Sequence, residues 1–324
     1  MLAAVIKEFG GPEVIKVLSN VPIPVIESSK QVLVRVGASG VNPVDTYIRN
    51  GQYAVLPTLP YTPGRDGAGI VEKVGADVRD VNIGDRVFFA SPVTGSAAEY
   101  CLADRVFPLP PGLTLQEGAC VGVPYMTAYR ALFLLGKAQK GQRILVHGAS
   151  GGVGVAAVQM AAERGCTVVG TAGTDDGAKL VLTNGATDVF NHRTAGYLEE
   201  MKKKYPEGFD LIVEMAAHQN LASDLDLLAK NGRVAIVESR GEVKVNPRAL
   251  MSKESSVFGV QLGLSTPEDW AESSSYVYKF LNSSRFRPAI GRVYPLESIA
   301  AAHRDIMAGG GAHGKLIVSI NDQL

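Results

Sequence analysis

From Arg143 onwards, short apolar runs alternate with helix-like segments, and this alternation is the feature that most limits the possible folds. We expect helices at Val153–Arg164, Asp176–Thr183, Tyr197–Lys204 and Leu221–Ala229. The apolar runs around them read ILVHG, TVVGTA, DVFN, LIVEM, VAIVE and SVFGV. Short strands that are apolar on both faces and alternate with helices form a parallel sheet that helices cover on both sides. The pattern therefore predicts an α/β fold with a doubly wound, six-stranded Rossmann sheet.

The stretch HGASGGVG follows the first of these runs and has four glycines in eight residues. Its spacing is G-x-x-G-x-x-G from Gly148 to Gly154 and not G-x-G-x-x-G, but glycine permits the same tight turn and the same close backbone approach. The amino end of the following helix would bind a phosphate. A P-loop is excluded because no Gly-Lys-Ser/Thr follows. The stretch predicts a loop that binds the pyrophosphate of a dinucleotide, the alternative being a glycine-rich turn without a ligand.

The end of the second apolar run distinguishes NADPH from NADH. An NAD enzyme usually has a carboxylate there, whereas TVVGTA runs into Gly173-Thr174. Lys179 and the turn Asn191-His192-Arg193 supply nearby cations that fit a 2′-phosphate. Asp175-Asp176 weigh against this interpretation, although they can instead cap the next helix. We therefore expect NADPH, the alternative being that His192 and Arg193 are solvated loop residues.

The first third of the chain reads as strands and turns, with QVLVRVGA, GAGIVEKVG and GDRVFFA as strands and prolines too frequent for long helices. A capping-box pattern follows at Thr114 and Glu117, and then a helix from Pro124 to Gly136. Near the end of the chain, GRVYPL and KLIVSI have no helix-paired partners, so we expect them to complete the first domain. The expected domains are residues 1–123 with 264–324, and residues 124–263. Helices are expected near 267–281 and 296–307.

Composition excludes several classes of protein. The 324 residues suit two domains, and 32 basic against 32 acidic residues argue against a polyanion as the main partner. No signal peptide or membrane span is evident, since the longest apolar stretch is Val153–Ala162. Cys101, Cys120 and Cys166 are too few and too scattered for a disulfide framework or a metal cage, and we expect them in the core. A cytoplasmic protein is expected.

A first domain rich in β-strands, followed by a Rossmann domain, resembles the medium-chain dehydrogenase/reductase superfamily. In its zinc-dependent members, G-V-C and G-H-E segments supply metal ligands; the matching segments here read Gly40-Val41-Asn42 and Gly64-Arg65-Asp66. An amide and a guanidinium cannot replace thiolate and imidazole as zinc ligands. The four-cysteine lobe of these enzymes is also missing, because only SPVTGSA separates GDRVFFA from AEYCLA. We therefore expect no metal and a substrate that accepts electrons without a Lewis acid.

The chain resembles more closely the zinc-free, zeta-crystallin-like NADPH:quinone oxidoreductases. The segments EFGGPEVIKV, GVNPVDTYIRNGQY, LPYTPGRDGAG, VPYMTAYRAL, VHGASGGVG, FNHR and NPR carry this similarity, in order, over nearly the whole chain. The resemblance implies a GroES-like catalytic domain, NADPH as the cofactor, ortho- and para-quinones as substrates, a cytosolic location and a homotetramer. Whether a semiquinone is released by one-electron transfer or a hydride is transferred directly stays open.

The resemblance also implies site residues. Tyr47 would lie next to the nicotinamide, and Tyr47 and Asn42 would position the quinone and hydrogen-bond its oxygens; the alternatives are a packed aromatic ring and a turn cap. The implied cofactor-binding residues are Tyr47, Ser150, Gly151, Gly152, Val153, Gly173, Lys179, His192, Asn220, Val237, Glu238, Ser239, Arg240, Val260, Gln261 and Leu262. Glu238 stands where the family usually has glycine, and its carboxylate could repel phosphate or narrow the quinone pocket. We expect His147 to be a hydrogen-bonded core residue, and Tyr53 either to line the cleft or to pack.

Two other functions fit the same residues. One is an NADPH-dependent enone or alkenal reductase, which would use the same fold and cofactor. The other is a binding protein, either for AU-rich RNA or as a structural protein of the crystallin type. The neutral net charge and the lack of an aromatic and basic platform weigh against RNA as the main partner.

Overall fold

The computed structural model describes residues 1–283, 285–308, 313–321 and 323–324. The chain forms two compact units. The first contains residues 1–123, 287–308 and the strand at 315–319, and the second contains residues 124–286.

The second unit contains the predicted six-stranded parallel sheet. Its spatial order is β10-β9-β8-β11-β12-β13, so the direction of winding reverses between β8 and β11. The strands are β8 (Arg143–Val146), β9 (Thr167–Ala172), β10 (Asp188–Asn191), β11 (Phe209–Glu214), β12 (Leu228–Ile236) and β13 (Ser256–Gly259). All six apolar runs are thus confirmed as strands. In such a sheet the point of reversal, at the carboxyl ends of the strands, is where a ligand binds.

Helices cover both faces of this sheet, as the pattern predicts. Consecutive residues of a strand point to opposite faces. On β11, Leu211 lies against Gly136 at the end of a π-helical segment (Arg130–Leu135), whereas Ile212 belongs to the core cluster that includes Leu221. The four predicted helices are present as α4 (Gly152–Glu163), α5 (Asp175–Thr183), α6 (Tyr197–Lys204) and α7 (Ala217–Leu227).

Helix α7 differs from the prediction at both ends. It begins at Ala217 and not at Leu221, and it ends at Leu227 because Leu228 is already extended and opens β12. The apolar run Leu227-Leu228-Ala229 suits a helix and a strand equally, so the spacing of its apolar residues cannot show where α7 ends and β12 begins.

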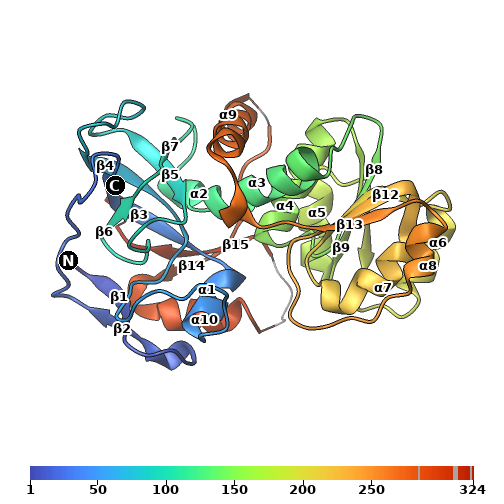
Figure 1. Ribbon diagram of the computed structural model, residues 1–324, viewed down its shortest axis with the longest axis horizontal. Helices are drawn as coiled ribbons and strands as arrows, with labels where there is room; N and C mark the ends of the chain where they lie inside the picture. The colour runs from blue at the N-terminus through green and yellow to red at the C-terminus, as the bar shows by residue number, and fades with distance from the viewer. Residues whose placement is uncertain (284, 309–312, 322) are drawn as a thin grey trace. The chain divides into compact units, whose positions relative to one another are not determined.

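The long helix near the end of the chain also differs from the prediction. We expected residues 264–324 in the first domain, but α9 (Pro267–Ser283) lies in the second unit. Its Tyr276 ring lies 4.7 Å from the ring of Tyr129 at the end of α3 (Gly122–Tyr129), and Asp269 pairs with Arg130 at 2.5 Å. Aromatic packing therefore fixes the place of α9, and Figure 1 shows it beside α3.

The first unit is built around a seven-stranded sheet. Its order is β14-β15-β3-β4-β5-β7, and β6 also pairs with β3. The strands are β3 (Val32–Val41), β4 (Asp66–Val74), β5 (Arg86–Ala90), β6 (Tyr100–Ala103), β7 (Phe107–Pro108), β14 (Ile290–Pro295) and β15 (Lys315–Ser319). The prediction that the two tail strands complete the first domain is confirmed, because β15 pairs antiparallel with β3, as Figure 1 shows in red and blue. A separate hairpin consists of β1 (Ala3–Ile6) and β2 (Ile15–Leu18).

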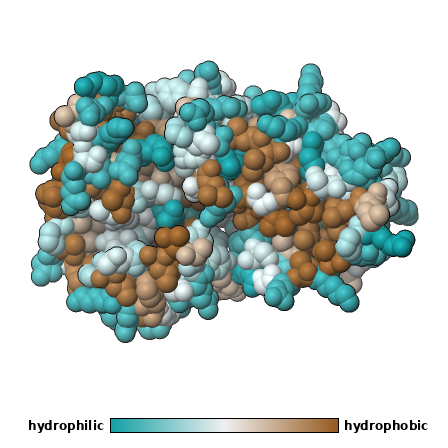
Figure 2. Space-filling model, viewed as in Figure 1, coloured by the Kyte–Doolittle hydropathy of each residue, from teal (hydrophilic) through white to brown (hydrophobic). Residues whose placement is uncertain are grey.

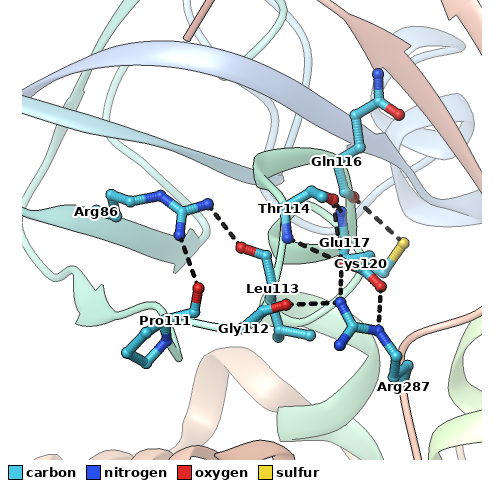
Figure 3. A network of polar contacts seen from close by, with 9 residues as sticks. All are labelled: Arg86, Pro111, Gly112, Leu113, Thr114, Gln116, Glu117, Cys120 and Arg287. Carbon is cyan, nitrogen blue, oxygen red and sulfur yellow. Dashed lines mark hydrogen bonds and ion pairs between the residues drawn. The ribbon is translucent and has the colours of Figure 1, made fainter.

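Short helices join these strands. Helix α1 (Pro43–Arg49) follows β3 directly, and 3₁₀ turn Leu296–Ser298 and α10 (Ile299–Asp305) follow β14. The predicted capping box at α2 (Leu115–Gly118) is confirmed. Glu117 N–H donates to Oγ1 of Thr114 at 3.1 Å, Thr114 N–H donates to Glu117 Oε2 at 2.8 Å, and Arg287 holds the same carboxylate at 2.7 Å (Figure 3).

Candidate functional site

The glycine loop between β8 and α4 forms a cradle of backbone. Gly148 has a φ of +57°, and the N–H of Gly151 donates to its carbonyl oxygen at 3.0 Å. A Cβ at Gly154 would overlap that same oxygen, so the first turn of α4 packs directly on the loop. Gly151 precedes the helix and has no side chain that could cap it. The N–H groups of the first turn are therefore suited to an anion such as a pyrophosphate.

The tip of β9 lies next to the turn after β10. A Cβ on Gly173 would be 2.8 Å from Nε2 of His192 and 3.0 Å from Nε of Arg193, so the structure brings these three predicted residues together. Desolvation and the neighbouring Arg193 lower the pKa of His192, which makes its imidazole neutral at pH 7. The cations available to a 2′-phosphate are therefore Arg193 and, in the second turn of α5, the exposed Lys179.

The cap of α5 differs from the prediction. Thr174 accepts the N–H of Gly177 at 3.1 Å, whereas Asp175 and Asp176 lie exposed in the first turn. Their negative charges interact favourably with the positive end of the helix dipole. They are part of the helix itself and are not its N-cap.

The predicted residues after β11 and β12 are joined by hydrogen bonds. The backbone oxygen of Glu214 accepts the N–H of Val237 at 2.8 Å, and Glu238 O accepts the N–H of Ala217 at 3.1 Å. The side chain of Asn220 donates to Glu214 Oε1 at 3.2 Å. These contacts bring Asn220 and the segment Val237–Arg240 to the carboxyl ends of neighbouring strands.

The carboxylate of Glu238, which replaces the family's glycine, has a cation beside it. Nε of Arg240 lies 2.7 Å from its Oε1. Ser239 donates to the carbonyl oxygen of Gly241 at 2.9 Å, so the segment turns back on itself. The pairing reduces the repulsion that Glu238 would exert on a phosphate.

The last predicted segment follows β13. Val260 is buried and its N–H donates to Ile236 O at 2.8 Å, Gln261 is exposed, and Leu262 opens a 3₁₀ turn that ends at Leu264. This segment follows a parallel strand, as the other predicted cofactor residues of the second unit do. The predicted residues Ser150–Val153, Gly173, His192, Asn220, Val237–Arg240 and Val260–Leu262 thus share one edge of the sheet.

Beneath that edge lies a buried cluster of His147, Asp224 and Glu214. Nε2 of His147 is 2.9 Å from Asp224 Oδ1 and 3.6 Å from Glu214 Oε2, and Nδ1 is 3.3 Å from Oγ1 of Thr171. Burial by itself would lower the pKa of His147, but the two carboxylates outweigh it and raise the pKa to about 9. The donor atoms lie within 4.8 Å of one another, a spacing that a metal could use, but the imidazole–Asp224 hydrogen bond accounts for the grouping.

His147 thus occupies a hydrogen-bonded place in the core, whereas its two partners were missed. Glu214 ends the apolar run LIVEM, and Asp224 lies on the face of α7 that carries Ala217, Leu221 and Leu225. A charged residue at a core position of an amphipathic helix was the available signal, because such a residue needs a buried partner.

In the first unit, the predicted Asn42 lies at the end of β3 and is the N-cap residue of α1. It is 3% exposed; its N–H donates to Asp45 Oδ2 at 2.8 Å, and its Oδ1 accepts a hydrogen bond from Lys315 Nζ. Tyr47 follows one turn later on α1 and is partly exposed, as is Tyr53 beyond the helix. Asn42 and Tyr47 are therefore close along one short helix.

The segments in which metal ligands would be expected lie side by side, because Gly40 of β3 pairs with Asp66 of β4. Nζ of Lys315 lies 3.3 Å from Asp66 Oδ2, and Arg65 donates to Oγ of Ser91 at 2.6 Å. Burial raises the pKa of Asp66 to about 6, although the Lys315 ammonium opposes the rise. Lys315, the first residue of the run KLIVSI, was not predicted as a site residue. A lysine that begins an apolar strand was the available signal, because a buried ammonium needs a partner.

A cavity of about 220 Å³ opens beside α1 within the first unit. Its walls combine apolar residues with polar groups from Asp45, Tyr61, Thr62 and Arg65. The apolar lining includes Ile48, Val55, Leu56, Pro57, Pro92 and Val93. Such a mixed lining suits a small molecule that has both apolar surface and polar groups.

Comparison with protein families gives two matches. Residues 28–123 match the alcohol dehydrogenase GroES-like domain, and residues 152–277 match the family described as zinc-binding dehydrogenase. None of the helices in the described part of the chain is both long and apolar enough to span a bilayer.

Individual proteins resemble the chain over nearly its whole length. A mouse (Mus musculus) quinone oxidoreductase is 49% identical over 323 residues, which cover 98% of this chain and 97% of the mouse protein. The structure of the Escherichia coli quinone oxidoreductase complexed with NADPH has a TM-score of 0.89 at 27% identity, covering 98% of this chain and 100% of the other. A quinone oxidoreductase from Thermus thermophilus, also solved with NADPH, has a TM-score of 0.85 at 30% identity, covering 99% and 100%.

Proposed function

Because this chain belongs to the quinone oxidoreductase family, we propose that it is an NADPH-dependent reductase of ortho- and para-quinones. The observation that carries the proposal is the edge of the six-stranded sheet, where the glycine loop and five other predicted segments meet. The quinone oxidoreductases from Escherichia coli and Thermus thermophilus were solved with NADPH, which supports the same cofactor here.

The residues at this edge fit NADPH. The lack of a side chain at Gly154 lets the first turn of α4 pack on the loop Ser150–Val153, and the N–H groups of that turn suit a pyrophosphate. We assign the 2′-phosphate to Lys179 and Arg193, with the neutral His192 as a hydrogen-bonding group. We assign Asn220 and the segments Val237–Arg240 and Val260–Leu262 to the rest of the cofactor. When bound, NADPH supplies the reducing equivalents.

The quinone would be held by the first unit. Tyr47, partly exposed on α1, would position the ring and hydrogen-bond its oxygens. Asn42 is 3% exposed and its amide is held by Lys315 and Gly40, so it would act only by fixing the start of α1. The cavity beside α1, which neither residue lines, offers apolar surface nearby. We propose that no metal takes part. The amide of Asn42 and the guanidinium of Arg65 are poor zinc ligands, and the Lys315 ammonium already lies against Asn42 and Asp66.

The test is oxidation of NADPH and of NADH by the purified protein, followed at the nicotinamide absorbance. We expect turnover with 9,10-phenanthrenequinone, a marked preference for NADPH, and insensitivity to chelators. Faster turnover of a 2-alkenal than of any quinone would instead show an enone reductase. Loss of activity after chelation would overturn the zinc-free assignment.

An RNA-binding function is tested separately by a gel shift with AU-rich RNA, with and without NADPH. No shift at micromolar protein would exclude it. Thermal protection by RNA but not by NADPH would overturn the enzyme assignment.

We further propose a cytoplasmic homo-oligomer, either a dimer or a tetramer. The thiols of Cys101, Cys120 and Cys166 are free, as is usual in a reducing compartment. Strand β13 lies at an edge of its sheet, and Met251 and Leu264, which flank it in sequence, are 74% and 73% exposed. Figure 2 shows apolar surface on the visible face of the second unit. Light scattering after gel filtration measures the oligomeric state, and a monomer would contradict this proposal.

A further inference from the structure

Within the buried cluster, the carboxylate of Glu214 lies between His147 and the turn that follows β11. On the buried side its Oε2 lies 3.6 Å from Nε2 of His147, which is itself held at 2.9 Å by Asp224. Glu214 and Asp224 are both fully buried. A carboxylate held in this way has a single orientation, because turning it would leave charges unpaired inside the protein.

The other oxygen of Glu214 faces the turn that leads into α7. Oε1 accepts the N–H of Ala216 and, at 3.2 Å, a hydrogen from Nδ2 of Asn220. The backbone oxygen of the same residue accepts the N–H of Val237 at 2.8 Å. One residue therefore holds two segments that we assign to the cofactor.

The chemistry of this contact decides which way the Asn220 amide points. Oε1 of Glu214 is an acceptor because it already receives the N–H of Ala216, so it binds the NH₂ group of the Asn220 amide and not its oxygen. Burial and the nearby Asp224 raise the pKa of Glu214 to about 7, which leaves this role of Oε1 unchanged. The Oδ1 atom of Asn220 is on the other side of the same planar group. Since Asn220 is partly exposed, this oxygen is available as an acceptor.

We infer that Glu214 is a positioning residue for the cofactor, which presents the Asn220 carboxamide with its oxygen outward to accept a hydrogen bond from NADPH. The donors on NADPH are the ribose hydroxyls, the nicotinamide carboxamide NH₂ and the adenine NH₂, and each of them suits an amide oxygen. The inference rests on the proposed binding of NADPH. His147 and Asp224 act one step further away, because they fix Glu214.

The test is a double-mutant cycle on NADPH affinity, measured by the fluorescence of the bound nucleotide. Glu214→Met keeps the side-chain volume but removes the acceptor, and Asn220→Ala removes the amide. We expect each variant to raise the Kd for NADPH about tenfold, the usual effect of losing one hydrogen bond to a charged or well-oriented group. The double variant should not exceed the larger single effect by more than about threefold, because both changes remove the same contact.

Two further variants separate positioning from folding. Glu214→Gln keeps an acceptor for Asn220 and should retain the wild-type Kd within about threefold. Asp210→Asn changes a carboxylate at the other end of β11, where it accepts the N–H of Arg143 at 2.7 Å, and should leave the Kd unchanged. Melting temperatures show which variants are folded.

The inference is overturned if the effects of Glu214→Met and Asn220→Ala multiply, or if folded Glu214→Met binds NADPH normally. It is also overturned if Glu214→Gln binds as weakly as Glu214→Met. If the wild-type protein binds no NADPH, the proposed function fails first, and that result is distinct from the others.

Discussion

The ammonium of Lys315 lies 3.3 Å from Oδ2 of Asp66, and both side chains are buried. The two residues are far apart in the sequence, yet only one strand, β3, separates their strands in the sheet. Gly40 of that strand permits the approach, since a Cβ there would lie 3.0 Å from Cε of Lys315.

Removing the ammonium should destabilise the first unit strongly. Lys315→Met leaves Asp66 as an unpaired buried charge, and such changes cost about 3–5 kcal/mol of unfolding free energy. The double variant Lys315→Met/Asp66→Asn removes both charges and should be more stable than the single Lys315→Met variant. Urea unfolding measures the difference, and equal losses in the two variants would show that the ion pair does not matter. Lys73→Met, on an exposed position of β4, is the control.

The stability of the protein should depend on pH through His147. Its pKa is raised from 6.5 to about 9 in the folded chain, because the carboxylates of Asp224 and Glu214 outweigh the effect of burial. The folded state binds this proton more tightly than the unfolded state. The contribution of this protonated histidine to the unfolding free energy is therefore complete below pH 6.5 and is lost as the pH rises through about 9.

Replacing His147 removes this dependence. Between pH 6.5 and pH 9, the unfolding free energy of His147→Gln should fall less than that of the wild type. Urea unfolding across this range measures the two slopes. Identical slopes would mean that the histidine does not change its protonation on folding.

A single methyl group in the glycine loop should disrupt the cofactor site. The Cβ of Gly154→Ala would overlap the carbonyl oxygen of Gly148, so the loop and the helix must separate. Overpacking of this kind costs about 1–3 kcal/mol, and the Kd for NADPH should rise with it. Gly112→Ala adds the same methyl group where no atom lies within 4 Å, and it should change neither quantity.

The choice of NADPH over NADH should depend on Lys179. Lys179→Met should raise the Kd for NADPH about tenfold, because one charged contact to the 2′-phosphate is lost. The Kd for NADH should stay unchanged, since NADH has no phosphate there. Lys203→Met, an exposed lysine in the last turn of α6, is the matched control. Equal weakening of both nucleotides would place Lys179 outside the phosphate pocket.

The parts of the fold that the sequence predicts well are those with local causes. The six apolar runs became strands because each is short and bounded by turns, and Thr114 with Glu117 formed its capping box within four residues. The place of α9 was not predictable in this way. The contact between Tyr276 and Tyr129 joins segments far apart in the chain, and no sequence pattern in either segment indicates that the other is its partner.

The same distinction applies to the site. The segments at the ends of the parallel strands could be predicted because the topology alone brings those ends to one edge. The position of Asp224 on the core face of α7 indicates only that it needs a buried partner. That this partner is His147 could not be predicted, since Glu214 and Asp224 are distant from it in sequence and meet it through the order of β8 and β11. The neutral state of His192 likewise follows from its surroundings and not from its residue type.

The position of β15 also affects how the molecule is made. The six-stranded sheet ends with Gly259, so all its strands have been synthesised while the last part of the chain is still on the ribosome. The seven-stranded sheet begins far earlier in the sequence, yet β3 lacks one neighbour until residues 315–319 emerge. The unit that starts first is therefore completed last, and a chain truncated between Gly259 and Lys315 contains a whole six-stranded sheet and an open edge on β3.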